Sequence, residues 1–322
     1  MSTPAPPSEG RAFSPEEDVL QRQASGPPAS VAQPGTGHAP SPEKDDARRQ
    51  ADSRPTATAL PLLASGACHV WSVELDQSPD VQAALAEHLS EDERRHMQAL
   101  RLPRLRSHYA VAHGALRVLL GRYLGIEPRL CRYATGPRGK PMLAETCPAP
   151  AAGGAASALH FNMSHAGTQA LIAIARSVEI GVDIELRRDM DDMAGVARTV
   201  LSQADLDLWL ALPEAQRVTA FYAFWTRKEA VSKAAGTGLY MDFPGLSVEF
   251  RPGCPAAVRR IDAAFGKPRE WLLAELDCAP GYNAALAART PALHISLHEA
   301  RIDEDGAANL DAEAPPDPGS FT

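Results

Sequence analysis

Residues 224–233 read Phe-Trp-Thr-Arg-Lys-Glu-Ala-Val-Ser-Lys, and at 100° per residue they predict a helix whose apolar stripe contains Lys228. The other members of that stripe are Phe221, Phe224, Trp225, Val231 and Ala235. A lysine that faces a core requires a partner. Glu229 and Lys233 are spaced i,i+4 on the adjacent flank, so an anion site can form at the edge of the core. The helix is expected to end at Gly236.

An earlier segment, Gly181-Val-Asp-Ile-Glu185, alternates as a strand does. Gly181, Asp183 and Glu185 point to one face, and the neighbouring Ile and Val residues point to the other. Two carboxylates on one face suit Mg²⁺, a hard cation that takes oxygen ligands, and Mn²⁺ accepts the same ligands. Gly181 has no side chain, which leaves room for a ligand to approach the backbone. Glu229 is expected to supply a third oxygen.

Each of these features has an ordinary structural explanation when it occurs alone. An Asp-x-Glu pair on a strand is commonly a solvated face, and a Glu-Lys pair at i,i+4 is commonly a surface ion pair of about 0.3 kcal/mol. Their occurrence together favours a functional site. Two upstream segments, Gly139-Lys-Pro141 and Phe161-Asn-Met-Ser-His165, add further chemistry-bearing residues.

In this combination the motifs resemble those of the 4'-phosphopantetheinyl transferases of the Sfp type. The matching elements, in order, are Gly139-Lys140-Pro141, Asn162-Met-Ser164-His165, Gly181-Val-Asp183-Ile-Glu185, Trp225-Thr-Arg-Lys228-Glu229-Ala-Val-Ser-Lys233 and Gly236-Thr-Gly-Leu239. The resemblance covers roughly residues 66–300. It implies transfer of the phosphopantetheine arm of coenzyme A, the co-substrate, to a serine of an apo acyl or peptidyl carrier protein. The released product would be 3',5'-adenosine diphosphate.

The resemblance also implies roles for individual residues. Asp183, Glu185 and Glu229 would bind the metal ion, with Glu229 favoured as general base and Lys233 as a donor to the leaving phosphate. A carboxylate that ligates a metal is a weak base, so the two roles of Glu229 compete. The catalytic set is therefore expected to be Asp183, Glu229 and Lys233. Contacts to coenzyme A are expected from Lys140, Ser164, His165, Lys228 and Lys233.

Net charge is −8, which argues against general nucleic-acid binding, but the charge is unevenly distributed. From Arg94 to Lys140 there are eleven Lys or Arg residues and one acid, Glu127. A solvated helix face would explain this basic tract. The functional alternative is a surface for the 3'-phosphate of coenzyme A and for an acidic carrier, whose encounter rate a positive potential raises. The candidate phosphate ligands here are Arg106, His108, His113 and Arg117.

The order of predicted elements favours an α+β fold with two subdomains. Residues 66–177 contain a strand at 69–75, helices near 81–99 and 105–124 separated by Pro103, and strands near 130–134, 159–163 and 169–175. Residues 178–300 contain a strand at 178–186, helices near 191–200, 203–212 and 214–235, and strands near 246–250, 269–276, 281–288 and 292–298. The resemblance implies that the two subdomains are similar and related by pseudo-twofold symmetry, with the active site at their interface.

Composition sets the ends of the chain apart from these subdomains. Residues 1–65 hold 11 of the 28 prolines and are expected to be a disordered extension, and residues 301–322 an acidic, loose tail. We find neither the apolar run of a secretory signal nor a segment long enough to span a bilayer. Five widely spaced cysteines without a C-x-x-C pair argue against zinc sites and a disulfide framework. We therefore expect a cytoplasmic monomer that does not associate with membranes.

Two alternatives use the same residues. One is a metal-dependent pyrophosphate hydrolase, although the chain lacks a cluster of glutamates on one helix and a second set of metal ligands. The other is a non-catalytic module that binds coenzyme A or carrier proteins, which would have no need for Asp183, Glu185, Glu229 and Lys233 together. The pathway that the carrier serves does not follow from the sequence.

Overall fold

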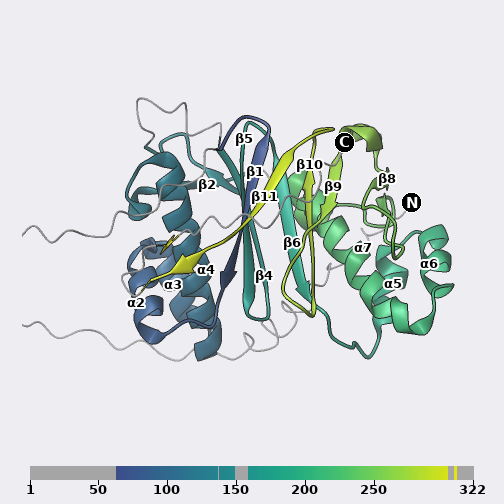
Figure 1. Ribbon diagram of the computed structural model, residues 1–322, viewed down its shortest axis with the longest axis horizontal. Helices are drawn as coiled ribbons and strands as arrows, with labels where there is room; N and C mark the ends of the chain where they lie inside the picture. Colours follow the sequence, from purple (N-terminus) through teal and green to yellow (C-terminus); the bar gives the residue numbers. More distant parts are fainter. Residues whose placement is uncertain (1–62, 137, 149–158, 304–307, 310–322) are drawn as a thin grey trace, which may run out of the picture. The chain divides into compact units, whose positions relative to one another are not determined.

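Two small sheets lie between two groups of helices, as Figure 1 shows. The computed structural model describes residues 63–136, 138–148, 159–303 and 308–309, all within the unit Thr58–Thr322. The first sheet has the strand order β11-β1-β5-β4 and the second has the order β6-β10-β9. Helices and strands alternate along the chain in the mixed order of an α+β fold, which confirms the predicted class.

The first subdomain follows the predicted order of elements, with one helix divided in two. Its elements are β1 (Ala67–Glu74), α2 (Pro79–Glu87), α3 (Glu91–Ala99), α4 (Pro103–Leu124), β2 (Tyr133–Thr135), β3 (Pro141–Leu143), β4 (Leu159–Ala166) and β5 (Gln169–Arg176). The single helix predicted at 81–99 is wrong because Ser90 starts a new helix. Its side chain accepts from the amide of Glu93, and Glu93 in turn accepts from the amide of Ser90.

The second subdomain repeats the sequence of a strand, three helices and further strands. Its elements are β6 (Ile180–Leu186), α5 (Met193–Val200), α6 (Gln203–Leu210), α7 (Glu214–Ala234), β7 (Ser247–Val248), β8 (Val258–Arg260), β9 (Leu272–Glu275) and β10 (Tyr282–Ala288). The predicted end of α7 is confirmed, because Gly236 follows it with a φ of 65° that favours glycine.

Strand β11 (His294–Glu299) returns to the first sheet. It pairs in parallel with β1, placing Trp71 beside His298, and β12 (Arg301–Ile302) and β13 (Ala308–Asn309) follow as a short hairpin. The strand predicted at 292–298 is confirmed, but its assignment to the second subdomain is wrong. The bulk of the predicted extension at 1–65 and of the predicted tail lies outside the described residues.

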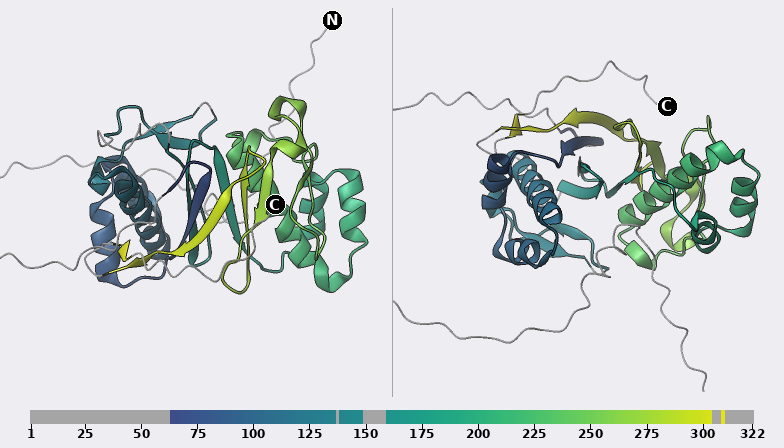
Figure 2. Two further views of the ribbon diagram at one scale, coloured as in Figure 1. Left: turned by 45° about the horizontal axis from the view of Figure 1, so that its top comes forward. Right: turned by 90° about the horizontal axis from the view of Figure 1, so that it is seen from below.

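Three buried clusters hold the layers together. In the first, α2 and α4 cover one face of the first sheet, where Trp71 and Leu119 are fully buried. In the second, the opposite face of that sheet packs on the second sheet through residues such as Val70 and Val182. In the third, α7 covers the outer face of the second sheet. Both views in Figure 2 show the two groups of helices on opposite sides of the sheets. The second subdomain thus meets the first along β4 and β6, which lie side by side.

Candidate functional site

A glycine allows α7 to approach β6 closely. A Cβ atom on Gly181 would lie 2.2 Å from the carbonyl oxygen of Ala230 and 2.4 Å from the amide nitrogen of Ala234, both on the α7 backbone. The prediction that Gly181 leaves room for a ligand is therefore wrong, because the helix occupies that space. The predicted alternation of β6 is confirmed, since Val182 packs toward the first sheet and Gly181 faces the helix. Close packing brings the acidic face of β6 against Lys233.

Asp183, Lys233 and Ser164 form a closed hydrogen-bonded triangle. The ammonium of Lys233 donates to Oδ1 of Asp183 at 2.5 Å and to Oγ of Ser164 at 3.0 Å, while Ser164 donates to the same Oδ1 at 2.8 Å. The three residues come from β6, α7 and β4, so the triangle joins the two subdomains. Lys233 thus faces the acidic side of β6.

Burial and charge oppose each other in this triangle. Asp183 is 3% exposed, and its burial raises the pKa of the carboxyl above its usual range, against the effects of Lys233 and Ser164. Burial works to lower the pKa of Lys233, but the carboxylates of Asp183, Glu229 and Glu185 prevail and raise it. Lys233 is therefore the positive charge among these three acids.

Glu185 is held by an indole. Its Oε1 accepts a hydrogen bond of 3.1 Å from Nε1 of Trp225, and the side chain is 8% exposed. Sequence reasoning placed Trp225 only in the apolar stripe. A buried indole N–H needs an acceptor, and Glu185 was the nearby candidate on the adjacent strand.

One oxygen of Asp183 fits a hard cation. Its Oδ2 is buried and has no hydrogen-bond donor in the described part of the chain. The other two acids do not complete a set of three with it: within the described ranges, no three His, Cys, Asp or Glu side chains are grouped closely enough to hold a metal ion. The predicted convergence of Asp183, Glu185 and Glu229 is thus not found, because Lys233 lies among them and Trp225 holds Glu185.

Lys228 faces away from this site. It is fully buried, and its ammonium donates to the carbonyl oxygens of Val200 at 2.8 Å, Phe243 at 2.6 Å and Leu246 at 2.5 Å. Burial lowers its pKa to about 7. The prediction that Lys228 binds coenzyme A is wrong, because three backbone carbonyls take all its donor hydrogens. Its role is to attach the loop after α7 and the end of α5 to the helix.

Lys140 lies across the junction of the subdomains. Its ammonium donates to Oε2 of Glu179 at 2.6 Å and to the carbonyl oxygen of Ile180 at 3.0 Å, directly before the acidic part of β6. His160 contacts the other oxygen of Glu179, and these two partners lower the pKa of Glu179 to about 2. An anionic ligand of Lys140 would compete with Glu179.

His165 and His113 lie on neighbouring elements, β4 and α4. His165 is exposed. It lies close enough to His113 for a positive charge on His165 to lower the pKa of His113. Burial lowers the pKa of His113 to about 4, and its ring stacks on Tyr109 with centroids 3.9 Å apart. His113 is therefore neutral at pH 7 and offers no positive charge to a phosphate.

Arg117 is a structural residue. Its Nε donates to Glu93 at 2.7 Å and one terminal nitrogen donates to the carbonyl oxygens of Pro128 and Cys131, while the guanidinium lies 4.9 Å from the ring centroid of Tyr133. The prediction that Arg117 binds the 3'-phosphate is wrong, since only 2% of it is exposed.

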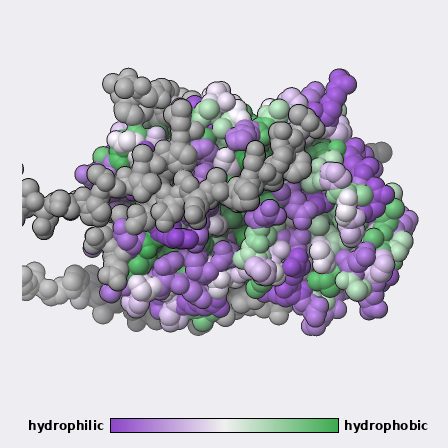
Figure 3. All heavy atoms as spheres, viewed as in Figure 1, coloured by the Kyte–Doolittle hydropathy of each residue, from purple (hydrophilic) through white to green (hydrophobic). Residues whose placement is uncertain are grey.

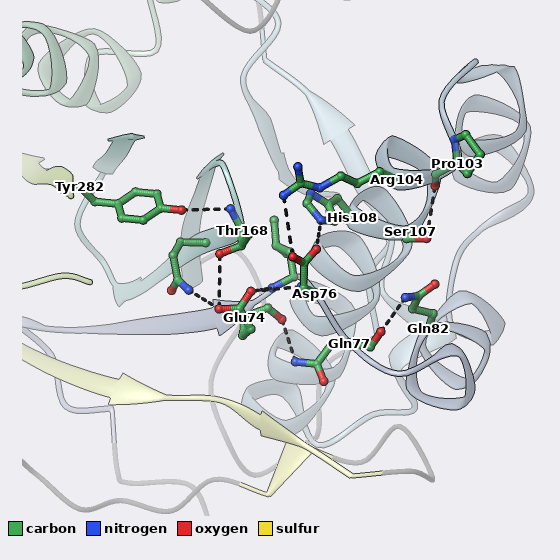
Figure 4. Close-up of polar contacts among 12 residues, drawn as sticks. Glu74, Asp76, Gln77, Gln82, Pro103, Arg104, Ser107, His108, Thr168 and Tyr282 are labelled. Carbon is green, nitrogen blue, oxygen red and sulfur yellow. Dashed lines mark hydrogen bonds and ion pairs between the residues drawn. The ribbon is translucent and has the colours of Figure 1, made fainter. Parts of the chain in front are cut away.

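The remaining candidates of the basic tract lie at the start of α4. His108 contacts Oδ1 of Asp76 at 2.6 Å and Arg104 lies 3.8 Å from the same carboxylate, as Figure 4 shows. Arg106 is half-buried, and among the described residues it forms no ion pair. Of the four predicted phosphate ligands, Arg106 is the one whose charge is not matched by a described acid.

Figure 4 also shows how the turn between β4 and β5 is fixed. Thr168 donates its amide to the hydroxyl of Tyr282 at 3.0 Å, and its own hydroxyl approaches Glu74 at 3.5 Å. Tyr282 belongs to the second subdomain, so this contact holds the turn against that subdomain. The turn directly follows Ser164 and His165 in the chain. Nothing in the sequence pattern predicted the pair, because the two residues are far apart in the chain.

Hydrophilic and hydrophobic residues are mixed over the described part of the face in Figure 3. No helix among the described residues is long and apolar enough to cross a membrane. The five cysteines are free thiols.

The sequence is similar to those of several known proteins. The model of the 4'-phosphopantetheinyl transferase superfamily matches residues 179–287, which include β6 and α7. The chain is 32% identical over 214 residues to 4'-phosphopantetheinyl transferase HetI of Nostoc sp., covering 66% of this chain and 84% of HetI. It is 34% identical over 121 residues to AcpT of Salmonella typhimurium, covering 56% of AcpT, and 26% identical over 176 residues to Sfp of Bacillus subtilis, covering 71% of Sfp. The similarity to Sfp is thus lower than that to HetI, and the Sfp type is not singled out.

Proposed function

The chain belongs to the 4'-phosphopantetheinyl transferase superfamily, and we propose that it moves the phosphopantetheine arm of coenzyme A to a serine of an apo acyl or peptidyl carrier protein. In this reaction the serine oxygen bonds to the phosphorus that carries the pantetheine arm. The P–O bond of the pyrophosphate breaks, and 3',5'-adenosine diphosphate leaves. The observation that carries the proposal is the meeting of Asp183, Glu185 and Lys233 where α7 packs on β6.

Asp183 and Glu185 are the proposed metal ligands. Asp183 has a buried oxygen without a donor, and Glu185 lies two residues further along the same face of β6. Mg²⁺, or Mn²⁺ in its place, would neutralise the pyrophosphate when bound there. Glu229 stays a candidate third ligand, a role that competes with its role as base because a carboxylate that ligates a metal is a weak base.

Glu229 is the proposed general base for the serine hydroxyl. It lies on α7 one turn before Lys233 and is close enough to raise the pKa of that lysine. Lys233 is a quarter exposed and donates to Asp183, to Ser164 and, at 3.3 Å, to the carbonyl oxygen of Val182. Its ammonium would donate to a leaving phosphate by exchanging the long contact to that carbonyl, which a fully buried lysine such as Lys228 cannot do. Most of the rate enhancement in phosphoryl transfer comes from such positioning and neutralisation of charge.

The coenzyme is proposed to lie across the two subdomains. Lys140, His165 and Arg106 line the first subdomain, and Lys140 already contacts an acid that precedes β6. We also propose that the subdomains are related by pseudo-twofold symmetry, with the active site between them. In support, the strand orders β1-β5-β4 and β6-β10-β9 follow the same scheme. In each, the strand that comes first in the chain is the neighbour of the strand that comes last of the three. Each of the two sheets is covered by one long helix, α4 or α7.

The test is incubation of the full-length protein with coenzyme A, Mg²⁺ and a panel of apo carrier proteins, followed by intact mass measurement of each carrier. We expect at least one carrier to gain the mass of phosphopantetheine and the Ser-to-Ala form of that carrier to gain nothing. A reaction without carrier is run in parallel. Release of 3',5'-adenosine diphosphate there, with no carrier modified elsewhere, would contradict transfer and indicate pyrophosphate hydrolysis instead.

A further inference from the structure

Strand β4 presents polar side chains to the second subdomain where the neighbouring positions of β5 present apolar ones. Phe161 and Met163 contact the cluster under α4. Asn162 and Ser164 point to the opposite face, beside Ala173 and Leu171 of β5 in the pairing register. Those two neighbours belong to the apolar cluster between the sheets. Asn162 and Ser164 are therefore a polar break in an apolar interface, and such a break requires hydrogen-bond partners.

Both polar side chains find their partners on β6. Oδ1 of Asn162 accepts from the amide of Val182 at 2.7 Å. The hydroxyl of Ser164 donates to Oδ1 of Asp183 at 2.8 Å and accepts from Lys233 at 3.0 Å. β4 and β6 are not neighbours in a hydrogen-bonded sheet, so these side chains make the polar connection between the two edges.

Ser164 and Lys233 contact the same oxygen of Asp183. Ser164 and Lys233 both donate to Oδ1, and Oδ2 is left buried without a donor from the described residues. Without the hydroxyl, Lys233 would be the one described side chain left on Oδ1. The carboxylate could then turn about its Cβ–Cγ bond and present both oxygens to the ammonium. The oxygen that fits a cation would then be engaged by the protein itself.

We propose that Ser164 is a positioning residue that acts through Asp183, and this inference rests on the proposed function of the same site. The hydroxyl fixes the carboxylate with Oδ2 directed away from Lys233, which prepares Asp183 to bind a divalent cation. This differs from the role that the sequence motif implied, in which Ser164 contacts the phosphates of coenzyme A. In the positioning role, Ser164 affects metal affinity in the absence of coenzyme A.

The experiment compares the full-length protein with Ser164→Ala, Ser164→Thr and Ser72→Ala. Ser72 is a matched control, because it is also a strand serine with a hydroxyl hydrogen bond, to the carbonyl oxygen of His298 at 3.3 Å, and it lies outside the site. Binding of Mn²⁺ is measured without coenzyme A by electron paramagnetic resonance, and transfer kinetics are measured with saturating carrier. Thermal unfolding of each variant verifies that the fold is retained.

We expect Ser164→Ala to weaken Mn²⁺ binding by about tenfold or more, as loss of a residue that orients a metal ligand does. Its kcat should fall by a similar factor with little change in the KM for coenzyme A, and Ser164→Thr and Ser72→Ala should resemble the wild type. Unchanged Mn²⁺ affinity with a raised KM for coenzyme A would overturn the proposal and restore the phosphate-contact role. Absence of Mn²⁺ binding in the wild type would also overturn it. A third outcome separates the two proposals. If the wild type binds Mn²⁺ and Ser164→Ala does not, the positioning role stands. If neither protein then modifies any carrier, the proposed transfer function fails.

Discussion

The replacement Gly181→Ala tests whether close packing of α7 on β6 builds the site. The added Cβ would lie 2.2 Å, 2.4 Å and 2.8 Å from three atoms of α7: the carbonyl oxygen of Ala230, the amide nitrogen of Ala234 and Cβ of Lys233. Ordinary contact distances begin near 3.4 Å. Two of the three atoms are backbone, so no side chain rotation relieves the overlap. The helix and the strand must separate by about 1 Å.

That separation acts directly on the charged residues. The Lys233–Asp183 contact of 2.5 Å would lengthen to about 3.5 Å, beyond the range of a good hydrogen bond. A displacement of about 1 Å at reacting groups can lower the rate about 100-fold. Overpacking should also lower the free energy of unfolding by about 1–3 kcal/mol, which is compatible with a folded protein.

The assay measures kcat for carrier modification by intact mass and the free energy of unfolding by urea titration. Ile180→Val is the matched control, because Ile180 is the neighbouring residue on β6 but packs between the sheets. It should lose about 1 kcal/mol of stability while α7 stays in place, so its kcat should be nearly normal. A Gly181→Ala protein with normal kcat and stability would refute the packing argument.

Four further outcomes are expected. Asp183→Ala and Glu229→Gln should each lower kcat by about 100-fold or more with the fold retained, and a variant of either kind with near-normal turnover in the same assay would remove that residue from the catalytic set. Lys228→Met should leave three carbonyl oxygens without a donor, so the midpoint of urea unfolding should fall by the equivalent of about 2 kcal/mol. The kcat of the folded protein, measured at low temperature, should stay within about threefold of the wild-type value. A variant of normal stability with weakened coenzyme A binding would show instead that Lys228 belongs to the site. Because the folded pKa of His113 is about 4, below its unfolded value near 6.5, the unfolded chain binds more protons between these values and stability should fall on acidification through that window. The effect should be about 1 kcal/mol per pH unit, and thermal unfolding at several pH values should show a smaller fall for His113→Phe than for the wild type. Chelation of divalent ions should abolish transfer, and added Mg²⁺ or Mn²⁺ should restore it; full activity in chelator would contradict the proposed role of the metal.

The strand and helix that carry the site could be predicted because their patterns are local. Alternation along β6 placed Asp183 and Glu185 on one face, and the i,i+4 spacing on α7 placed Glu229 beside Lys233. The end of α7 at Gly236 was equally local. These features depend only on residues within a few positions of each other, which is the range over which periodicity is informative.

Features that depend on distant residues could not be predicted in the same way. A lysine in an apolar stripe shows that the ammonium is buried, but it does not show whether a phosphate or carbonyl oxygens surround it. For Lys228 the answer came from the end of α5 at Val200 and from the loop that contains Phe243 and Leu246. Gly181 permits either a ligand or a helix to come close, and the strand pattern at 292–298 gives no indication that its partner is β1.

The ion pair between Asp183 and Lys233 is difficult to explain as a stabilising feature. Asp183 is 3% exposed, and desolvation of a carboxylate and an ammonium usually offsets most of their attraction, so apolar replacements of a buried pair are often neutral or stabilising. The second oxygen of Asp183 adds a further cost, because it is buried with no donor among the described residues. A fold selected for stability alone would lose both features. Their position at the junction of β4, β6 and α7 is what we expect if the carboxylate binds a cation there, as proposed above.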